Sequence, residues 1–285
     1  MTDKQFNRRD FVRKGVKGLT GFVDNLREKP THDTAEAGDI RIMSAMADYP
    51  GKDQPVSAFI ARPDGPGVYP AIIVIHEIFG LVDHIKDVAI RLAREGFVAI
   101  APDLFSREAP LQHQNDATMM LDLVRSIPDS RFLNDLVAAI AHLNVLTFVD
   151  EKRIGALGFC MGGLYAYLMA ARTPRLSAVA DFYGRVAYPG YTANKPEAPI
   201  DVVSRLHCPI LGIFAGEDHV VPVDDVHRLK DTMMEHKKSF EIKIYQNAPH
   251  AFFNDTRTSY RPDEAHDAWR RTINFFWKHL KGPST

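Results

Sequence analysis

Short, uninterrupted apolar runs alternate along this chain with segments of helical spacing, and this alternation constrains the fold more than any other feature. Residues 71–75 form a largely β-branched run, which is typical of a strand buried on both faces. Residues 83–95 follow with helical spacing, and Gly96 ends the segment. The apolar residues on one face of this expected helix are Ile85, Val88, Ala89 and Leu92. A strand is expected next at 97–101, so the order strand–helix–strand predicts a crossover between parallel strands.

The same alternation continues to the C-terminus and predicts an α/β fold with a mostly parallel, doubly wound sheet flanked by helices. Strands are expected at residues 41–47, 56–61, 71–75, 97–101, 153–159, 177–183, 210–215 and 240–245. Helices are expected at residues 83–95, 116–127, 130–146, 162–172, 223–236 and 262–280. Tyr49, Pro50 and Gly51 are expected to form the turn between the first two strands. Two long loops, 105–115 and 184–199, are expected to lie above the site, because such loops line the carboxyl ends of parallel strands.

The first 38 residues differ from the rest, so the 285-residue chain is interpreted as a charged extension followed by one domain at 39–285. The segment from Asn7 to Val12 resembles a twin-arginine export signal through Arg8 and Arg9. A working signal needs an apolar run of about 7 to 15 residues next, and Asp24 and the charged residues after it interrupt that run. A cytoplasmic location is therefore predicted, with export to the periplasm as the alternative.

Composition excludes several functional classes. With 35 Lys and Arg against 36 Asp and Glu, the formal net charge is −1, which argues against a broad nucleic-acid surface. The longest uncharged apolar stretch, 154–171, contains four glycines and is interpreted as strand, turn and helix rather than a membrane span. Two cysteines exclude a disulfide framework and a four-thiolate zinc site. No long apolar seam is present, so a monomer or a dimer is expected.

One of the two cysteines lies in a glycine-rich turn between an expected strand and an expected helix. The sequence there is Gly-Phe-Cys-Met-Gly-Gly, residues 158–163, which is the nucleophile-elbow pattern with Cys160 where serine is more usual. In such an elbow the residues two positions away must lack side chains, and the thiol projects at a helix N-terminus that favours a thiolate. The alternative is a small buried cysteine in an ordinary turn. Cys208 has no such surroundings and is interpreted as a packed core thiol.

A thiol nucleophile needs a base and a group that orients the base. Asp218 lies in a tight turn after the strand expected at 210–215, and His250 follows the next strand. The chain order Cys160, Asp218, His250 is the nucleophile–acid–histidine order of α/β-hydrolases. His250 is expected to transfer protons, and Asp218 to hold its tautomer. The alternatives are a turn-forming aspartate and a surface-loop histidine, but all three residues in this order favour a catalytic triad.

Taken together, six segments of the chain resemble the dienelactone hydrolase family of α/β-hydrolases. The resemblance covers nearly the whole chain after the extension and implies an α/β-hydrolase fold that acts on an ester or lactone without metal or organic cofactor. The matching segments are His76-Glu77-Ile78-Phe79-Gly80, Ala101-Pro102-Asp103-Leu104-Phe105, Gly158-Phe159-Cys160-Met161-Gly162-Gly163, Asp181-Phe182-Tyr183-Gly184, Gly216-Glu217-Asp218 and His250-Ala251-Phe252.

The resemblance also implies roles around the nucleophile. A glutamate at the position of Glu77 binds the resting thiol, swings away when substrate arrives and takes the thiol proton. The amides of Ile78 and Met161 would form the oxyanion hole. The other interpretation of Glu77 is a loop acid that caps the next helix. A thiolate formed only when substrate arrives would be protected from oxidation.

Four further residues are expected at the substrate. In the resembled family two arginines hold a substrate carboxylate, and Arg107 matches the first. The second position is Asn254 here, and Arg257, three residues on, is expected either to replace it or to pair with a surface acid. Tyr183 is expected to line the pocket or to pack in the core. The difference at Asn254 bears on the dienelactone substrate and not on the hydrolase assignment.

The sequence thus predicts an enzyme that cleaves a small ester or lactone, in the manner of a dienelactone hydrolase (carboxymethylenebutenolidase), through acyl-thioenzyme chemistry. Two alternatives differ in substrate or in class. The same machinery would suit a thioesterase or a short-chain carboxylesterase. A non-catalytic binding protein on this scaffold is the second alternative, although no member of the expected triad is missing.

Overall fold

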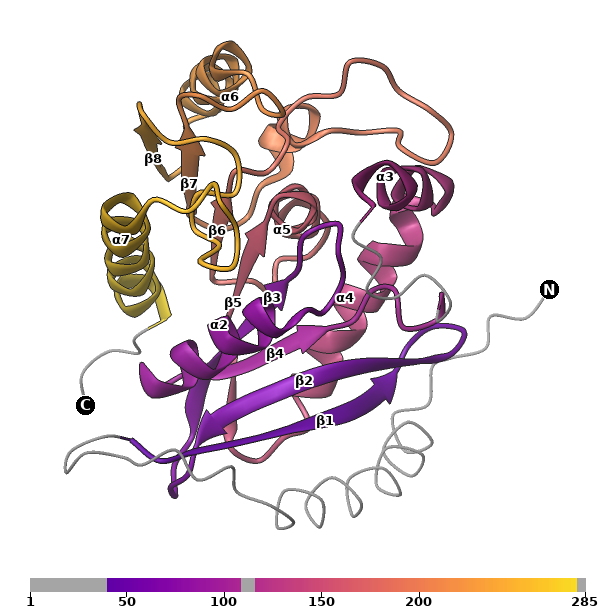
Figure 1. Ribbon diagram of the computed structural model, residues 1–285. Helices are drawn as coiled ribbons and strands as arrows, with labels where there is room; N and C mark the ends of the chain where they lie inside the picture. The colour runs from indigo at the N-terminus through magenta and orange to yellow at the C-terminus, as the bar shows by residue number, and fades with distance from the viewer. Residues whose placement is uncertain (1–39, 109–115, 281–285) are drawn as a thin grey trace.

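A computed structural model describes residues 40–108 and 116–280, which form one eight-stranded sheet with helices on both faces (Figure 1). The strand order is β1-β2-β4-β3-β5-β6-β7-β8. β1 pairs antiparallel with β2, β2 pairs antiparallel with β4, and every later neighbour is parallel. The mostly parallel, doubly wound sheet predicted from the sequence is therefore confirmed, with an antiparallel hairpin at one edge.

The helices and strands follow the expected order along the described chain. The strands are β1 (Ile42–Pro50), β2 (Pro55–Pro63), β3 (Tyr69–Ile75), β4 (Val98–Pro102), β5 (Val149–Phe159), β6 (Ala178–Phe182), β7 (Ile210–Ala215) and β8 (Phe240–Tyr245). The helices are α2 (Asp83–Arg94), α3 (Ala117–Ser126), α4 (Asp129–Leu143), α5 (Met161–Arg172), α6 (Val223–Glu235) and α7 (Pro262–Leu280), with a short 3₁₀ helix, η2 (Pro199–Arg205).

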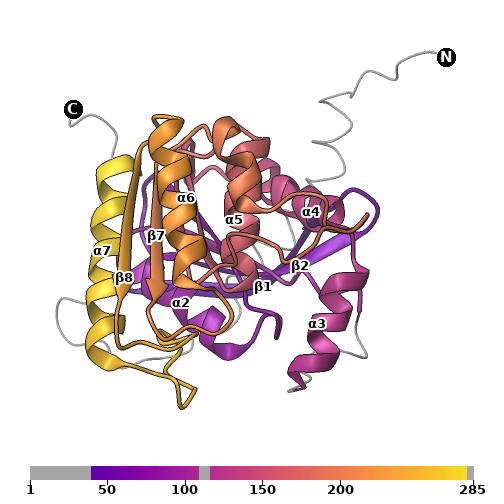
Figure 2. The ribbon, with the colours of Figure 1, turned by 90° about the horizontal axis from the view of Figure 1, so that it is seen from above.

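Two apolar cores sandwich the sheet, because successive side chains of a strand point to opposite faces. On β3, Ile73 and Ile75 belong to the core that α4, α5 and α6 cover, whereas Ile72 and Val74 belong to the core that α2 and α7 cover. Figure 2 shows α6, α5 and α4 on one side of β7 and β8, with α7 on the other side. The face of α2 predicted from its apolar spacing is the buried one. Helix α5 is buried almost throughout, which places its first turn at the centre of the molecule.

The turn expected at residues 49–51 is not where the sequence placed it. β1 continues through Pro50, and the connection to β2 lies at residues 51–54. The Tyr49 ring is buried, and its hydroxyl donates to the carbonyl oxygen of Asp135 in α4 at 2.9 Å. This contact with a distant helix keeps Tyr49 extended, and a proline is tolerated at the end of an edge strand. No sequence pattern predicted η2, which begins at the end of the loop 184–199.

Several predictions fall wholly or partly outside the described residues. The extension 1–38, with the export-like segment around Arg8 and Arg9, lies outside them, so the predicted cytoplasmic location stays a prediction. The expected monomeric or dimeric state is also untested. Of the helices in the described part of the chain, none is both long enough and apolar enough to cross a membrane. The apolar stretch 154–171 forms the end of β5, the elbow and most of α5.

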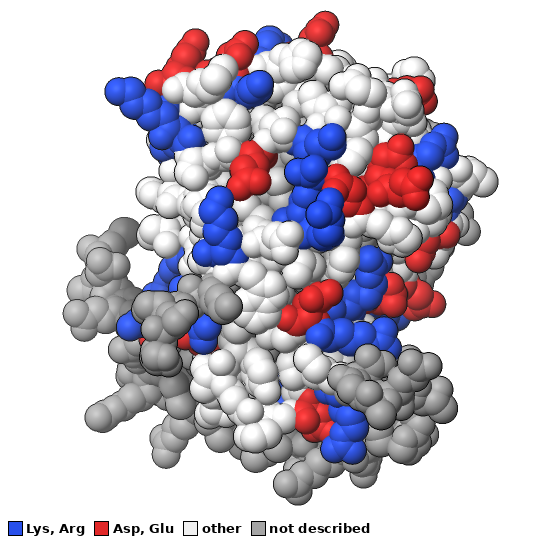
Figure 3. All heavy atoms as spheres, turned by 90° about the vertical axis from the view of Figure 1, so that its left-hand side faces the viewer, with Lys and Arg blue, Asp and Glu red and all other residues white. Residues whose placement is uncertain are grey.

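Charges of both signs are interspersed on the face that lies at the left in Figure 1, as the space-filling view shows (Figure 3). On α7, for example, Asp267 pairs with both Arg270 and Arg271. Such mixing agrees with the near-zero net charge and gives this face no extended positive surface of the kind that binds nucleic-acid phosphates.

Candidate active site

Cys160 occupies the sharp turn between β5 and α5. Its backbone has φ 54° and ψ −113°, a conformation that L residues rarely adopt. The Cys160 amide donates to the carbonyl oxygen of Phe182 at 2.9 Å, which ties the turn to the end of β6. The structure thus has the strained strand–turn–helix geometry that the elbow pattern predicts.

The glycines on either side of Cys160 are required by close backbone approach. A Cβ atom built on Gly158 would lie 2.1 Å from the carbonyl oxygen of Gly162. One built on Gly162 would lie 2.1 Å from the carbonyl oxygen of Ile75 in β3. Both distances are far below any real carbon–oxygen contact. The position two residues before Cys160 and the position two residues after it therefore require glycine.

The amides of Met161 and Ile78 belong to the segments that follow β5 and β3. Met161 is the first residue of α5, and amides of the first helical turn have no acceptor within the helix. Ile78 follows β3, which lies beside β5 with Ile75 paired to Gly158. Both amides therefore come from the carboxyl ends of adjacent parallel strands. This placement is compatible with the oxyanion hole expected from Ile78 and Met161, which remains a proposal.

The expected acid and base meet at the same edge of the sheet. Asp218 follows β7 and His250 follows the neighbouring β8, and His250 Nδ1 lies 2.7 Å from Asp218 Oδ2. The other carboxylate oxygen of Asp218 accepts hydrogen bonds from the amides of Val220 and Val221 at 2.7 and 2.9 Å. The Asp218 side chain is almost fully buried. Asp218 is therefore fixed by its own turn and can orient the imidazole.

The charge state of His250 depends on Cys160. Burial by itself would lower the pKa of His250, but the charge of Cys160 and the hydrogen bonds with Asp218 and Cys160 raise this pKa to about 10. An imidazole with such a pKa is protonated at neutral pH. The surroundings of His250 therefore favour an imidazolium, which is hydrogen-bonded to the Asp218 carboxylate.

The Glu77 side chain is buried. The side chains that contact it differ from the Cys160 thiol that the resemblance implies. Its Oε2 atom accepts a hydrogen bond from Asn254 Nδ2 at 3.1 Å. The same oxygen lies 3.9 Å from Arg257 Nε, and the Arg257 guanidinium rests 4.4 Å from the centre of the Phe79 ring. Asn254 and Arg257 thus both contact Glu77, and their expected contact with the substrate stays a prediction.

His76 holds the loop that carries Glu77, a role that the sequence analysis did not assign. Its ring is fully buried, and burial lowers its pKa, so it is neutral. The Nε2 atom accepts from the Leu104 amide at 3.1 Å, which leaves Nδ1 to donate to the Glu77 carbonyl oxygen at 2.6 Å. His76 thereby joins the ends of β3 and β4. In the sequence, the only sign of this role is that His76 stands beside Glu77 just after the apolar run 71–75.

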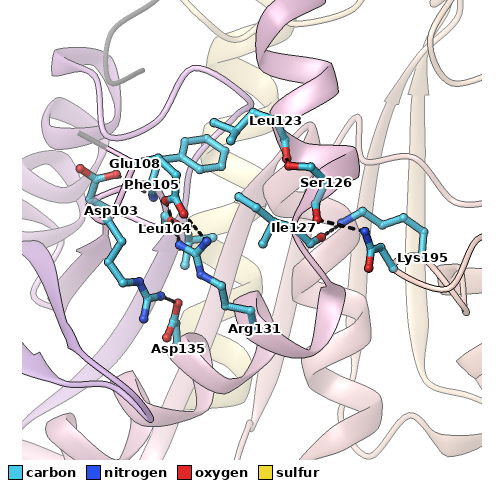
Figure 4. Close-up of polar contacts among 12 residues, drawn as sticks. Asp103, Leu104, Phe105, Glu108, Leu123, Ser126, Ile127, Arg131, Asp135 and Lys195 are labelled. Atoms are coloured by element: carbon cyan, nitrogen blue, oxygen red, sulfur yellow. Dashed lines mark hydrogen bonds and ion pairs between the residues drawn. The ribbon is translucent and has the colours of Figure 1, made fainter. Parts of the chain in front are cut away.

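The Phe105–Glu108 segment, which carries Arg107, is attached to α4 by two ion pairs (Figure 4). Arg107 pairs with the buried Asp135, and Arg131 pairs with Glu108. Arg131 also donates to the Leu104 carbonyl oxygen at 3.1 Å. Burial raises the pKa of Asp135, whereas Arg107 acts in the opposite direction. The Arg107 guanidinium therefore faces α4, and its expected contact with a substrate carboxylate is untested.

Tyr183 lies against the imidazole of His250. Its backbone φ is 44°, its side chain is fully buried, and its ring centre is 5.0 Å from that of His250. The Tyr183 hydroxyl has no hydrogen-bond partner among the described residues. Burial raises its pKa well above the usual value, and the charges of Glu77 and Cys160 raise it further. Tyr183 is thus a neutral side chain beside His250.

Behind the elbow lies another buried acid, Asp181 of β6. Its Oδ1 atom accepts from the Gly184 amide at 2.8 Å, and Oδ2 has no partner among the described residues. Burial raises the pKa of Asp181 to about 8, although the Gly184 amide and the charge of His250 lower it in part. The carboxyl group is therefore mostly protonated at neutral pH.

Replacing Asp181 by asparagine is expected to flatten the pH dependence of stability. Between the unfolded pKa of about 4 and the folded pKa of about 8, the folded state holds a proton that the unfolded state has lost. The unfolding free energy of the natural protein therefore falls as pH rises through this window, by up to about 1.4 kcal/mol per pH unit. Urea unfolding at pH 5 and pH 8 measures the difference, which should shrink by about 2 kcal/mol or more in Asp181→Asn. Equal differences in the two proteins would show that Asp181 is ionised when folded.

The groups gathered at this edge of the sheet are a thiol, an imidazole, two carboxylates and several amides. Such groups carry out nucleophilic and acid–base catalysis. Within residues 40–108 and 116–280, no three His, Cys, Asp or Glu side chains are grouped so that they could hold a metal ion. The arrangement supports attack on a carbonyl group by Cys160.

Comparison with known proteins gives concordant matches over most of the chain. The model of the dienelactone hydrolase family matches residues 56–280. A protein of Methylorubrum extorquens (strain AM1), named "Putative carboxymethylenebutenolidase", is 36% identical over 258 residues, covering 90% of this chain and 88% of the relative. A Bradyrhizobium protein, named "Probable 2-oxo-3-(5-oxofuran-2-ylidene)propanoate lactonase", is 39% identical over 228 residues, covering 80% of this chain and 91% of the relative.

A solved structure agrees with the sequence matches. The crystal structure of a "Putative Dienelactone Hydrolase" from Klebsiella pneumoniae superposes with a TM-score of 0.79 at 33% sequence identity. The match covers 82% of this chain and 98% of the Klebsiella chain. The architecture is therefore shared over nearly the whole length of that protein.

Proposed function

The chain belongs to the dienelactone hydrolase family and is an ester or lactone hydrolase of that family, and on this premise we propose that it works through a thioester formed on Cys160. One observation supports this mechanism above the others. The side chains of Asp218 and His250 are hydrogen-bonded at 2.7 Å, and His250 is in turn coupled to the elbow thiol. In this proposal the nucleophile, the base and the orienting acid come from three separate turns, which follow β5, β8 and β7.

In the proposed first half-reaction the Cys160 thiolate attacks the carbonyl carbon of the ester or lactone. The amides of Ile78 and Met161 stabilise the negative charge that develops on the carbonyl oxygen. When the tetrahedral intermediate collapses, the carbon–oxygen bond breaks and His250 gives its Nε2 proton to the leaving oxygen. The acyl group remains on Cys160 as a thioester.

In the second half-reaction water hydrolyses this thioester. His250 is now neutral and takes a proton from the water, whose oxygen attacks the acyl carbon. The carbon–sulfur bond breaks, the carboxylic acid product leaves, and Cys160 regains its negative charge beside the protonated imidazole. Asp218 keeps Nδ1 of His250 protonated throughout, so that Nε2 faces the reacting atoms.

We propose a small lactone or ester that bears a carboxylate as the substrate. The names of the relatives describe butenolide lactones with an acidic side chain. Arg257 is the more accessible of the two candidate arginines, because its side chain is 38% exposed whereas that of Arg107 is 14% exposed. Arg257 is therefore the better placed to bind the substrate carboxylate, and Tyr183 contributes apolar surface beside His250.

The proposal predicts a distinct order of substrates. Dienelactone should be hydrolysed with kcat/KM of about 10⁴ M⁻¹s⁻¹ or more, and p-nitrophenyl acetate at least roughly tenfold less efficiently, since the neutral ester lacks the carboxylate. Initial rates on these two compounds and on an acyl thioester measure the order. Fast cleavage of the neutral ester without dienelactone turnover would replace the lactone proposal by a general esterase. A preference for the thioester would indicate a thioesterase.

A further inference from the structure

His84 is a buried histidine in the first turn of α2, and its side chain is only 2% exposed. It follows Ile78 by six positions, and the segment between them is compact. The Gly80 amide donates to the Glu77 carbonyl oxygen at 3.3 Å, and the Val82 amide donates to the Gly80 carbonyl oxygen at 2.9 Å. Because these bonds tie the segment to the start of α2, the place of this helix sets the place of the Ile78 amide.

The His84 ring packs edge-on against two phenylalanines that border the candidate site. Its centre lies 6.3 Å from that of the Phe159 ring and 6.0 Å from that of the Phe253 ring. Phe159 is the last residue of β5 and directly precedes Cys160, whereas Phe253 lies three positions after His250. The two phenylalanine rings stack on each other with their centres 5.4 Å apart. One side chain of α2 thus packs beside both the Cys160 turn and the His250 loop.

A hydrogen bond attaches His84 to the same loop a second time. Its Nδ1 atom lies 3.1 Å from Oδ1 of Asp255. A carboxylate accepts hydrogen bonds and does not donate them, so Nδ1 carries the proton. The other ring nitrogen, Nε2, is buried and has no hydrogen-bond partner among the described residues. Asp255 is therefore the one hydrogen-bond partner that the described part of the chain gives to this imidazole.

Backbone strain in both turns requires that they be held from outside. Cys160 has φ 54°, and Ala251, which directly follows His250, has φ 60°. Residues other than glycine rarely adopt such angles, and these conformations persist only where the surrounding structure holds them. His84 contacts the residue before the first strained position and two residues shortly after the second. Without these contacts, the His250 loop is expected to relax.

We propose that His84 is a positioning residue for the hydrolysis, which holds the His250 loop and the Cys160 turn against the helix that follows Ile78. This inference rests on the proposed function, because it concerns the alignment of the groups that carry out that reaction. In this role His84 touches no reacting atom. It sets the distance of the His250 imidazole from the thiol and from the oxyanion amides, and a misplacement of about 1 Å can slow a reaction by about 100-fold.

Two substitutions remove the same hydrogen bond from its two ends. His84→Phe keeps an aromatic ring between the two phenylalanines but has no donor, and Asp255→Ala removes the acceptor. The test reaction uses the full chain in excess over p-nitrophenyl acetate, since this neutral ester gives the nearby Arg257 no carboxylate to bind. In each variant the single-turnover rate constant should fall about tenfold, whereas the enzyme concentration that gives half the maximal rate should stay within about twofold.

The double variant His84→Phe/Asp255→Ala should be no slower than either single variant, because all three lack the same bond. Asp255→Asn is the conservative variant, since its amide oxygen still accepts from His84, and its rate constant should stay within about threefold of the natural protein. A rate constant in Asp255→Asn as low as in Asp255→Ala would overturn the proposal. A double variant slowed by the product of the two single effects would also overturn it.

Two matched controls remove an exposed histidine and an exposed aspartate elsewhere. His227→Phe on α6 and Asp122→Ala on α3, where the aspartate pairs only with Arg125, should change neither measured value. If His84→Phe does not fold, Asp255→Ala still tests the bond, because the Asp255 side chain is 51% exposed. A natural rate constant in Asp255→Ala would contradict the positioning role.

Amide hydrogen exchange tests the same role without any substrate. In His84→Phe and in Asp255→Ala, peptides that cover residues 250–257 should exchange at least about fivefold faster than in the natural protein, whereas peptides of β3 and β7 should keep their rates. Faster exchange confined to this loop, without ester or lactone hydrolysis by the natural protein, would support the role of His84 in holding the loop and contradict the proposed function. Hydrolysis by the natural protein, with unchanged exchange and unchanged rate constants in both variants, would do the opposite.

Discussion

Cys160→Ala is expected to reduce kcat/KM for the best ester or lactone substrate by at least about 10⁴-fold, to a rate near that of uncatalysed hydrolysis. The variant keeps the proposed oxyanion amides and the Asp218–His250 hydrogen bond but has no atom that can form the thioester. Its fold should be unchanged, because Cys160 is only partly buried and lies at the margin of the core. Initial-rate kinetics together with a thermal melt of the same sample measure both properties.

Cys208→Ala is the matched control for this experiment. Cys208 is the other thiol of the chain, and it packs in the core just before β7, outside the proposed site. The control should lose about 1 kcal/mol of stability through the missing sulfur atom and keep its kcat/KM within about twofold. Hydrolysis at the natural rate by Cys160→Ala would remove the covalent mechanism altogether, whatever the substrate.

The regular alternation of strands and helices was predictable because it depends on local sequence patterns. Residues 71–75 are apolar at every position since β3 is covered on both faces, and the α2 spacing reflects a helix with one buried side. The exact ends were less predictable. β1 runs on through Pro50 because Tyr49 reaches α4, and no local pattern encodes a contact between residues 86 positions apart.

The candidate site shows the same division between local and distant information. The elbow and the order of Asp218 and His250 are local or topological properties, since side chains that follow parallel strands collect at one edge of the sheet. Whether Arg107 faces substrate or Asp135 depends on the packing of α4 against a loop. Likewise, that Asn254 faces Glu77, 177 positions earlier, follows only from the folded arrangement.

The largest effect on stability is expected at Gly162. In Gly162→Val the new Cβ atom would lie 2.1 Å from the Ile75 carbonyl oxygen, 2.6 Å from its carbonyl carbon and 2.8 Å from the His76 carbonyl oxygen. All three are backbone atoms of β3 and the residue after it, so no flexible side chain can move aside. Either α5 or the central strand must shift, and the substitution should prevent folding. Gly162→Ala should still lose about 3 kcal/mol or more, and the melting temperature should fall by roughly 10 °C.

Gly190→Ala distinguishes this clash from a general intolerance of glycine substitution. Gly190 lies exposed in the loop 184–199, and a Cβ atom there would meet no atom within 4 Å. Its unfolding free energy should stay within about 0.5 kcal/mol of the natural protein. Because the amide of Met161 and the side chain of Cys160 are placed by the same close approach of α5 to β3, any folded Gly162→Ala molecules should also hydrolyse substrate more slowly. A Gly162→Ala protein as stable as Gly190→Ala would mean that the elbow does not need the close contact with β3 described above.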